Sequence, residues 1–238
     1  MLQLALAVIP AVLAITLHEA AHGYAALALG DPTARLAGRL SLNPIRHIDR
    51  FGTIILPGIL LISQLIMIGR VEFMFGWAKP VPINPWAFVN PRRGMMWVAL
   101  AGPGMNFFLA WLAALAMRPI GEPDGLVELS IQFLLLRFVV FNLVLGLFNL
   151  LPLPPLDGGR VVVGILPLPL ARIWARLEGV GIGIVLIVLF VLPLAARELG
   201  FGFDPLREGL AAVMPWALRW IFYLAGYEGV FDDSNFDL

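Results

Sequence analysis

The sequence contains no cysteine and few charged residues. Its 238 residues are 60 % hydrophobic and 13 % charged, and the mean hydropathy is +0.90. Without cysteine there can be no disulfide framework, thiolate metal site or cysteine nucleophile, so a bound metal must use His, Asp, Glu or water. Sixteen basic residues balance sixteen acidic ones, which gives no support for a nucleic acid partner. So apolar a composition is typical of a multi-pass protein of the cell membrane, surrounded by the lipid bilayer.

Four long apolar runs predict membrane-spanning helices. A bilayer requires about 20 apolar residues for each helical span. The segments that meet this length are about 2–29, 95–117, 129–150 and 180–196. The predicted fold class is therefore an all-α polytopic membrane protein.

Two further apolar segments are less regular. Residues 51–69 carry Leu56-Pro57-Gly58 in their first turns, which predicts either a kinked span or a hairpin that turns back inside the membrane. Residues 209–226 repeat tryptophan and tyrosine at helical spacing, so we interpret them as a last span, with an interfacial helix as the alternative. The expected total is about five to six transmembrane helices.

Basic residues are concentrated in the loops 30–50, 70–94 and 151–176, whereas 118–128 has one arginine against three acidic residues. Because cytoplasmic loops carry an excess of arginine and lysine, we expect the first three loops to be cytoplasmic and 118–128 to face outside. The chain between 51 and 69 must then cross the membrane an even number of times. This predicts a re-entrant or extended segment before the second long span.

The first span carries the motif His18-Glu19-Ala20-Ala21-His22. Two residues four apart lie on one face of a helix, so both imidazoles can hold a single metal ion, with Glu19 beside it. The chain has only three histidines, which makes this motif match specific. A buried, hydrogen-bonded histidine pair is the alternative, but ionisable groups at membrane depth are costly and usually functional.

Two imidazoles leave a tetrahedral zinc ion one protein ligand short. Asp157 follows the span at 129–150, and the loop charges give this span and the first span the same direction, from outside to inside. Asp157 and the histidine pair should therefore lie near the same end of the membrane. An Asp-Gly turn after a helix is the alternative for Asp157.

Three stretches resemble motifs of the site-2 protease family of intramembrane zinc metalloproteases. They are the HExxH helix, the sequence Ala-Gly-Pro-Gly-Met-Asn at 101–106, and the pattern Asn-x-x-Pro-x-Pro-x-Leu-Asp-Gly-Gly-Arg at 149–160. Together with shorter matches, the resemblance covers residues 15–160. It implies an all-helical membrane protease. The chain departs from better-known members of the family, and we expect a short form without an inserted PDZ domain or C-terminal CBS domains.

The resemblance also assigns residues to the reaction. It implies one zinc ion per chain bound by His18, His22 and Asp157, with Glu19 as the catalytic acid/base. Asn149 matches the family asparagine that holds the substrate carbonyl. The expected function is zinc-dependent hydrolysis of a peptide bond in or near the transmembrane segment of a single-span membrane protein, with the active site towards the cytoplasm.

We expect a single integral membrane protease domain over residues 1–238. Its catalytic core would cover about 1–160, followed by C-terminal helices at about 175–226 and an acidic tail at 227–238.

The segment 76–85 is suited to holding a substrate in an extended conformation. Pro80 and Pro82 are two residues apart, so their missing N–H groups lie on one edge, and the other edge is predicted to be free to pair with a substrate strand. A plain proline-rich loop is the alternative.

Three other polar side chains receive structural interpretations. We expect His47 to be hydrogen-bonded within its own loop, because the proposed metal already has its protein ligands. Asn106 and Asn142 are interpreted as amides that bond between helices.

The alternative function is a polytopic transporter in which His18, Glu19 and Asp157 form a proton or metal-ion relay. Inverted repeats would support this alternative. The sequence shows no matching hydropathy halves, so the protease interpretation is preferred.

Overall fold

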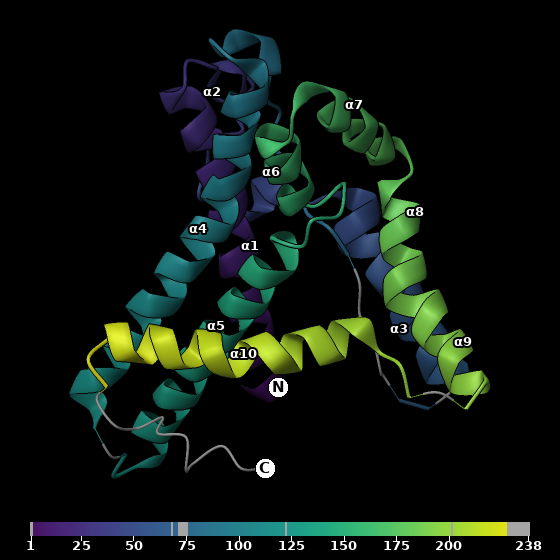
Figure 1. The fold of residues 1–238 in the computed structure, drawn as a ribbon. Helices are drawn as coiled ribbons and strands as arrows, with labels where there is room; N and C mark the ends of the chain where they lie inside the picture. Colours follow the sequence, from purple (N-terminus) through teal and green to yellow (C-terminus); the bar gives the residue numbers. More distant parts are fainter. Residues whose placement is uncertain (1, 68, 71–75, 122, 201, 228–238) are drawn as a thin grey trace.

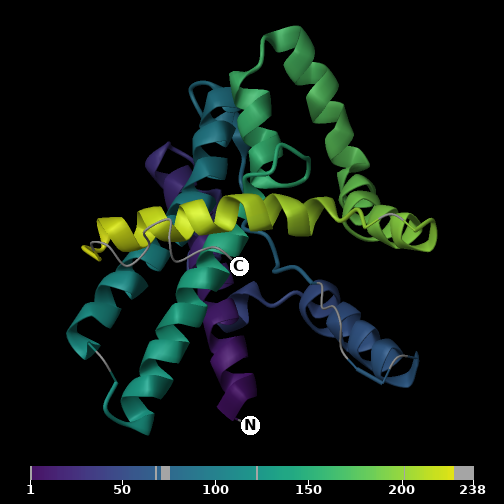
Figure 2. The ribbon, with the colours of Figure 1, turned by 60° about the horizontal axis from the view of Figure 1, so that its bottom comes forward.

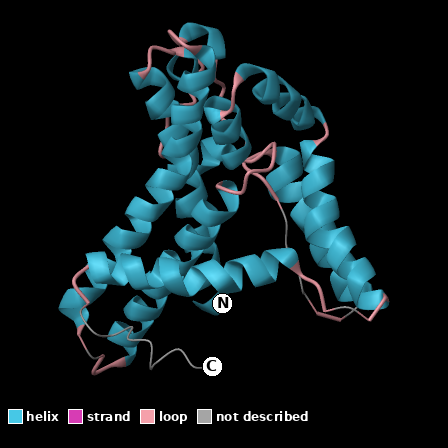
Figure 3. Ribbon diagram, in the orientation of Figure 1, coloured by secondary structure: helices cyan, strands magenta, loops and turns pink. Residues whose placement is uncertain are grey.

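The computed structural model describes residues 2–67, 69–70, 76–121, 123–200 and 202–227. All regular secondary structure within these ranges is helical, as Figure 3 shows. The all-α class is therefore confirmed. Of the predicted acidic tail, residues 228–238 lie outside the described part of the chain.

Three long helices form a bundle that carries the site. They are α1 (Leu2–Ala28), α4 (Pro91–Met117) and α5 (Leu126–Asn149), and α4 packs against both of the others (Figure 1). The start of α4 is set by Asn90, whose side chain accepts a hydrogen bond from the Arg93 N–H and so satisfies a free donor of the first turn. These helices lie within a few residues of the predicted spans.

A short helix, α6 (Asp157–Ile165), completes this bundle against α4. The chain between α5 and α6 turns back sharply, and Gly158 and Gly159 permit the turn because a Cβ at either position would collide with backbone atoms of residues 150–154. This turn brings Asp157, the first residue of α6, back towards the end of α5.

Residues 50–67 form a continuous helix. A π-helical turn at Arg50–Ile55 leads into α3 (Leu56–Met67), so the predicted hairpin at Leu56-Pro57-Gly58 is not formed. The Trp77 N–H donates to the Gly52 carbonyl at 3.1 Å, so the chain leaves the bundle near residue 52 and is back beside that point at residue 77. This return is compatible with an even number of crossings, which remains a prediction.

A second group of helices lies to one side of the bundle. It consists of α3, α7 (Leu168–Arg176), α8 (Gly181–Leu186) and α9 (Leu192–Glu198). A π-helical turn at Ile187–Val191 joins α8 to α9 into one helical segment, close to the span predicted at 180–196. Figures 1 and 2 both place α3, α8 and α9 on the same side of the bundle.

The last helix, α10 (Pro205–Leu224), crosses the bundle instead of running along it (Figures 1 and 2). Its Ala217, Ile221 and Phe222 are buried against α4 and α5. Trp216 and Trp220 remain exposed. This orientation favours the interfacial helix over the last span that we preferred from the sequence.

By length and composition, the described residues contain two helices that could span a membrane, Pro91–Ile120 and Leu126–Asn149. The total of five to six transmembrane helices therefore stays a prediction.

Candidate metal centre

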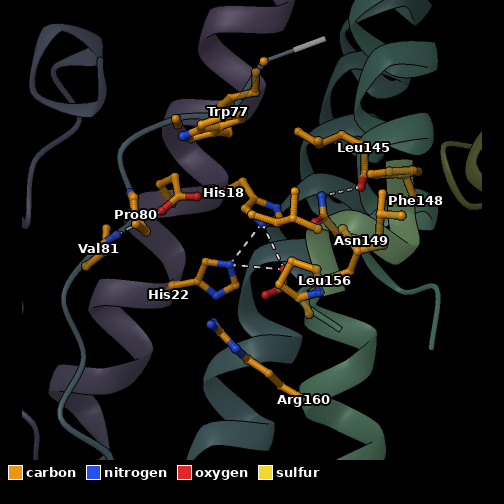
Figure 4. Close-up of a pocket in the computed structure, with 18 of the residues that line it drawn as sticks. His18, His22, Trp77, Pro80, Val81, Leu145, Phe148, Asn149, Leu156 and Arg160 are labelled. Atoms are coloured by element: carbon orange, nitrogen blue, oxygen red, sulfur yellow. Dashed lines mark hydrogen bonds and ion pairs between the residues drawn. The ribbon is translucent and has the colours of Figure 1, made fainter. Parts of the chain in front are cut away.

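The three predicted metal ligands lie together in the structure. His18 and His22 come from one face of α1 (Figure 4), and Asp157 comes from the first turn of α6. The Nε2 atoms of His18 and His22 are 3.0 Å apart. The Asp157 Oδ2 atom lies 3.1 Å from His18 Nε2 and 3.3 Å from His22 Nε2. Ligand atoms around a tetrahedral zinc ion are about 3.3 Å apart when each bond is about 2.0 Å. The triangle therefore has the dimensions of one face of a zinc coordination shell.

The outer nitrogen of each imidazole faces an oxygen. His18 Nδ1 lies 2.6 Å from Asn106 Oδ1, and His22 Nδ1 lies 2.7 Å from the Val98 carbonyl oxygen. Because a carbonyl oxygen can only accept, each Nδ1 carries the hydrogen, and each Nε2 of a neutral ring then carries a lone pair.

The inner atoms of the site are consequently three electron-pair donors. All three side chains are buried, and among the described residues Asp157 Oδ2 accepts no hydrogen bond although both Nε2 atoms are close. Lone pairs at such distances repel one another unless a cation lies between them. Two neutral imidazoles and a carboxylate are a usual donor set for zinc, so these residues fit the metal.

Helix α4 reaches the site through Gly102. A Cβ at this position would lie 2.5 Å from ring atoms of His22 and 2.6 Å from His18 Cε1. Only glycine leaves room for both imidazoles against α4 at this separation. Gly102 therefore allows α4 to approach the two imidazoles of α1 closely.

Glu19 lies beside the metal-binding triangle without belonging to it. Its Oε2 atom accepts a hydrogen bond from the Val81 N–H at 3.2 Å, so the segment 76–85 holds the carboxylate. Among the described residues, the possible metal ligands at this point are His18, His22 and Asp157, and Glu19 is not one of them.

A cavity of about 470 Å³ opens onto the site. Its walls come from α1, the segment 76–83, the end of α5, the turn into α6, and α8. Asn149 lines it, and its Nδ2 donates to the Leu145 carbonyl at 2.9 Å (Figure 4). The cavity thus brings together all five residues that the sequence assigned to the reaction.

The segment 76–85 differs from its predicted state. The edge opposite Pro80 and Pro82 is not free, because its N–H groups are already hydrogen-bonded. Trp77 donates to Gly52, Lys79 to the His47 carbonyl at 2.8 Å, and Val81 to Glu19. The prediction of a free edge is therefore wrong. Successive residues of an extended chain point their N–H groups to opposite edges, so the N–H groups of Trp77, Lys79 and Val81 lie opposite the prolines and face residues 47–52 and α1.

His47 lies in the neighbouring loop, as expected. Its Nε2 is 2.7 Å from the Ser41 carbonyl oxygen, and its side chain is buried. It does not join the metal-binding triangle.

Asn106 is a site residue that the sequence interpretation missed. We expected it to bond between helices, which it does, but its partner on α1 is the candidate zinc ligand His18. The signal was present in the spacing, because Asn106 follows Gly102 by four residues and so lies on the same face of α4.

Comparisons with known proteins identify relatives of this chain. The sequence model of peptidase family M50 matches residues 116–192. The chain is 39 % identical over 196 residues to YwhC of Bacillus subtilis, covering 81 % of this chain and 83 % of YwhC. It is 30 % identical over 145 residues to Rip2 of Mycobacterium tuberculosis, covering 60 % of this chain and about half of Rip2, 51 %. Both relatives are named as zinc metalloproteases.

No solved structure matches the chain. The relatives and the site together define a zinc-dependent metalloprotease of membrane-embedded type, whose cofactor is zinc. The chain belongs to peptidase family M50, the site-2 protease family.

Proposed function

We propose that this protein is an intramembrane endopeptidase that cuts a single-span membrane protein in or near its transmembrane segment. In this proposal His18, His22 and Asp157 bind one zinc ion. The observation that carries it is the buried triangle of lone-pair atoms, with sides of 3.0 to 3.3 Å. Zinc, when bound, supplies the positive charge that polarises a scissile carbonyl and acidifies a water molecule.

Glu19 is the catalytic acid/base of the proposed reaction. Its carboxylate lies in the cavity wall next to the ligands, and the Val81 N–H holds one of its oxygens. The carboxylate takes a proton from the attacking water and passes it to the amine that leaves when the C–N bond breaks. The oxygen of the water remains on the new carboxyl group.

Asn149 is proposed to stabilise the carbonyl oxygen of the substrate. An amide nitrogen has two hydrogens, and the Leu145 carbonyl accepts one of them. The second can be donated to the oxygen on which negative charge develops.

The substrate helix must unwind before it is cut, because its backbone hydrogen bonds shield each peptide bond. Ala78 and Pro80 line the cavity, and Pro80 has no N–H to donate. The N–H groups on the opposite edge of this segment are already hydrogen-bonded within the protein. We therefore propose that the N–H groups of the substrate backbone donate hydrogen bonds to carbonyl groups of this segment.

The arginine-rich loops support an active site on the cytoplasmic side. Single cysteines introduced at Arg92 and Asp124 can be labelled with an impermeant thiol reagent, because the chain has no other cysteine. We expect position 124 to react from outside and position 92 only after the membrane is opened. Labelling of position 92 from outside would contradict the proposed sidedness.

The function is tested with Glu19→Gln. This variant should keep one zinc per chain and lower substrate cleavage by about 10²- to 10⁴-fold, the contribution of a positioned acid/base. Membrane proteins that accumulate uncut in cells carrying this variant identify the substrate. Unchanged cleavage of such a protein by purified Glu19→Gln would refute the assigned role.

A further inference from the structure

A chain of buried amides connects α5 to the candidate zinc ligand His18. Asn142 Nδ2 donates to the Phe138 carbonyl at 2.8 Å, and Asn106 Nδ2 donates to Asn142 Oδ1 at 2.9 Å. Asn106 Oδ1 in turn lies 2.6 Å from His18 Nδ1. Both asparagines are 0 % exposed, so their amide groups need hydrogen-bond partners within the protein.

The direction of every hydrogen bond in this chain follows from its first member. The Phe138 carbonyl can only accept, so the amide nitrogen of Asn142 must face it and the amide oxygen must face Asn106. Asn106 must then present its nitrogen to Asn142 and its oxygen to His18. A second acceptor, the Ala14 carbonyl at 3.4 Å from Asn106 Nδ2, requires the same orientation.

The orientation of the Asn106 amide determines which nitrogen of His18 is free to bind zinc. Since Asn106 presents an oxygen, His18 must carry its hydrogen on Nδ1, and the lone pair of the neutral ring lies on Nε2, inside the triangle.

His22 reaches the same tautomer by a shorter route, because its Nδ1 donates directly to the backbone carbonyl of Val98. A backbone carbonyl cannot reverse its polarity, whereas a side-chain amide can rotate and exchange its oxygen for its nitrogen. His18 therefore depends on the groups that hold the Asn106 amide, which are Asn142 at 2.9 Å and, at the longer distance of 3.4 Å, the Ala14 carbonyl.

We propose that Asn106 and Asn142 are positioning residues that set the tautomer and ring orientation of His18, and through it the zinc affinity of the site. Asn106 acts directly on His18, and Asn142 acts by fixing which end of the Asn106 amide faces the ring. The proposal rests on the assignment of His18 as a zinc ligand.

Zinc affinity of the purified full chain, measured by competition with a chelator, tests the proposal without relying on activity. Asn106→Leu removes the acceptor, and we expect the affinity to fall by about 10- to 100-fold, the usual effect of losing such a partner. Asn106→Asp keeps an oxygen for His18 Nδ1 and should retain affinity closer to that of the wild type, although it disturbs the contact with Asn142. Asn142→Leu should give a smaller loss than Asn106→Leu.

The contrast between Leu and Asp at position 106 separates positioning from packing. A helix-packing amide would lower the unfolding temperature in both variants and leave the zinc affinity of the folded protein unchanged. Val139→Ala is the matched control, because Val139 is fully buried on α5, one turn before Asn142, and none of the four amide hydrogen bonds involves it. It should lower the unfolding temperature without changing zinc affinity.

Equal zinc affinity in wild type, Asn106→Leu and Asn142→Leu would overturn the proposal while leaving the zinc site intact. If Asn106→Leu does not fold, equal affinity in Asn142→Leu and wild type overturns it in the same way. Failure of the proposed function has a different signature, which is a wild-type chain without stoichiometric zinc or a His22→Ala variant that retains it.

Discussion

The bundle that carries the candidate metal site (α1, α4, α5 and α6) and the side helices (α3, α7, α8 and α9) are built from the same apolar residue types but pack differently. In the bundle, glycines and small residues let helices approach closely, and Asn106 and Asn142 lie between them without exposure. Large apolar side chains remain on the surface of both groups, with Val127 of the bundle 73 % exposed and Ile66 of the side helices 79 % exposed. Among the described residues, however, none of the buried polar side chains lies on the side helices.

This difference corresponds to two roles. The bundle positions the atoms of the candidate metal site precisely, whereas the side helices provide apolar surface. The bundle holds donor atoms within 3.0 to 3.3 Å of one another, which requires fixed helices and satisfied polar groups. The side helices contribute Ile182 and Val185 to the cavity wall, where apolar surface suffices. Substitutions in the bundle should therefore have much larger effects than similar ones in the side helices.

The largest effect is expected for His22→Ala. Loss of one of three protein ligands should abolish stoichiometric zinc binding and cleavage together. Metal analysis of the purified variant measures this. His47→Ala is the control, since His47 lies outside the triangle, and it should keep one zinc per chain. Full zinc retention in His22→Ala would remove the basis of the site.

Asn149→Ala should have a smaller effect, confined to catalysis. If its amide stabilises the developing oxyanion, the cleavage rate should fall by about 10²-fold while zinc content stays at the wild-type level. Cleavage rate and zinc content are measured on the same preparation. A normal rate would transfer the oxyanion role to another donor and leave Asn149 as an amide bonded to Leu145.

A matched pair of glycines tests the comparison directly. In Gly102→Ala the new methyl group would collide with both imidazoles, so we expect a loss of stability of about 1–3 kcal/mol and weaker zinc binding. Thermal unfolding and chelator competition measure the two effects. Unchanged zinc affinity would show that α4 can move away from α1 without disturbing the ligands.

The other member of the pair is Gly183→Ala in α8, and it should have the smallest effect. No atom lies within 4 Å of a Cβ at this position, and alanine is the better helix former by roughly 1 kcal/mol. We expect equal or slightly higher stability and unchanged zinc affinity. A loss as large as that of Gly102→Ala would contradict the division between bundle and side helices.

Much of the site could be predicted because its signals are local. The spacing of His18 and His22 places both rings on one helical face whatever surrounds the helix. Asp157 could be joined to them because loop charges constrain the direction of each span. Helix positions were predictable for the same reason, since length and apolar composition decide where a span can form.

Other features were decided only by tertiary structure. Spacing places Asn106 on the same face of α4 as Gly102, but the link from Asn106 to His18 also required this face to pack against α1. The edge opposite Pro80 is occupied because residues 47–52 and Glu19 lie beside it, and α10 crosses the bundle because Ala217 and Ile221 pack on α4 and α5. In each case the partner is distant in sequence, and periodicity shows which face of an element is available but not what will cover it.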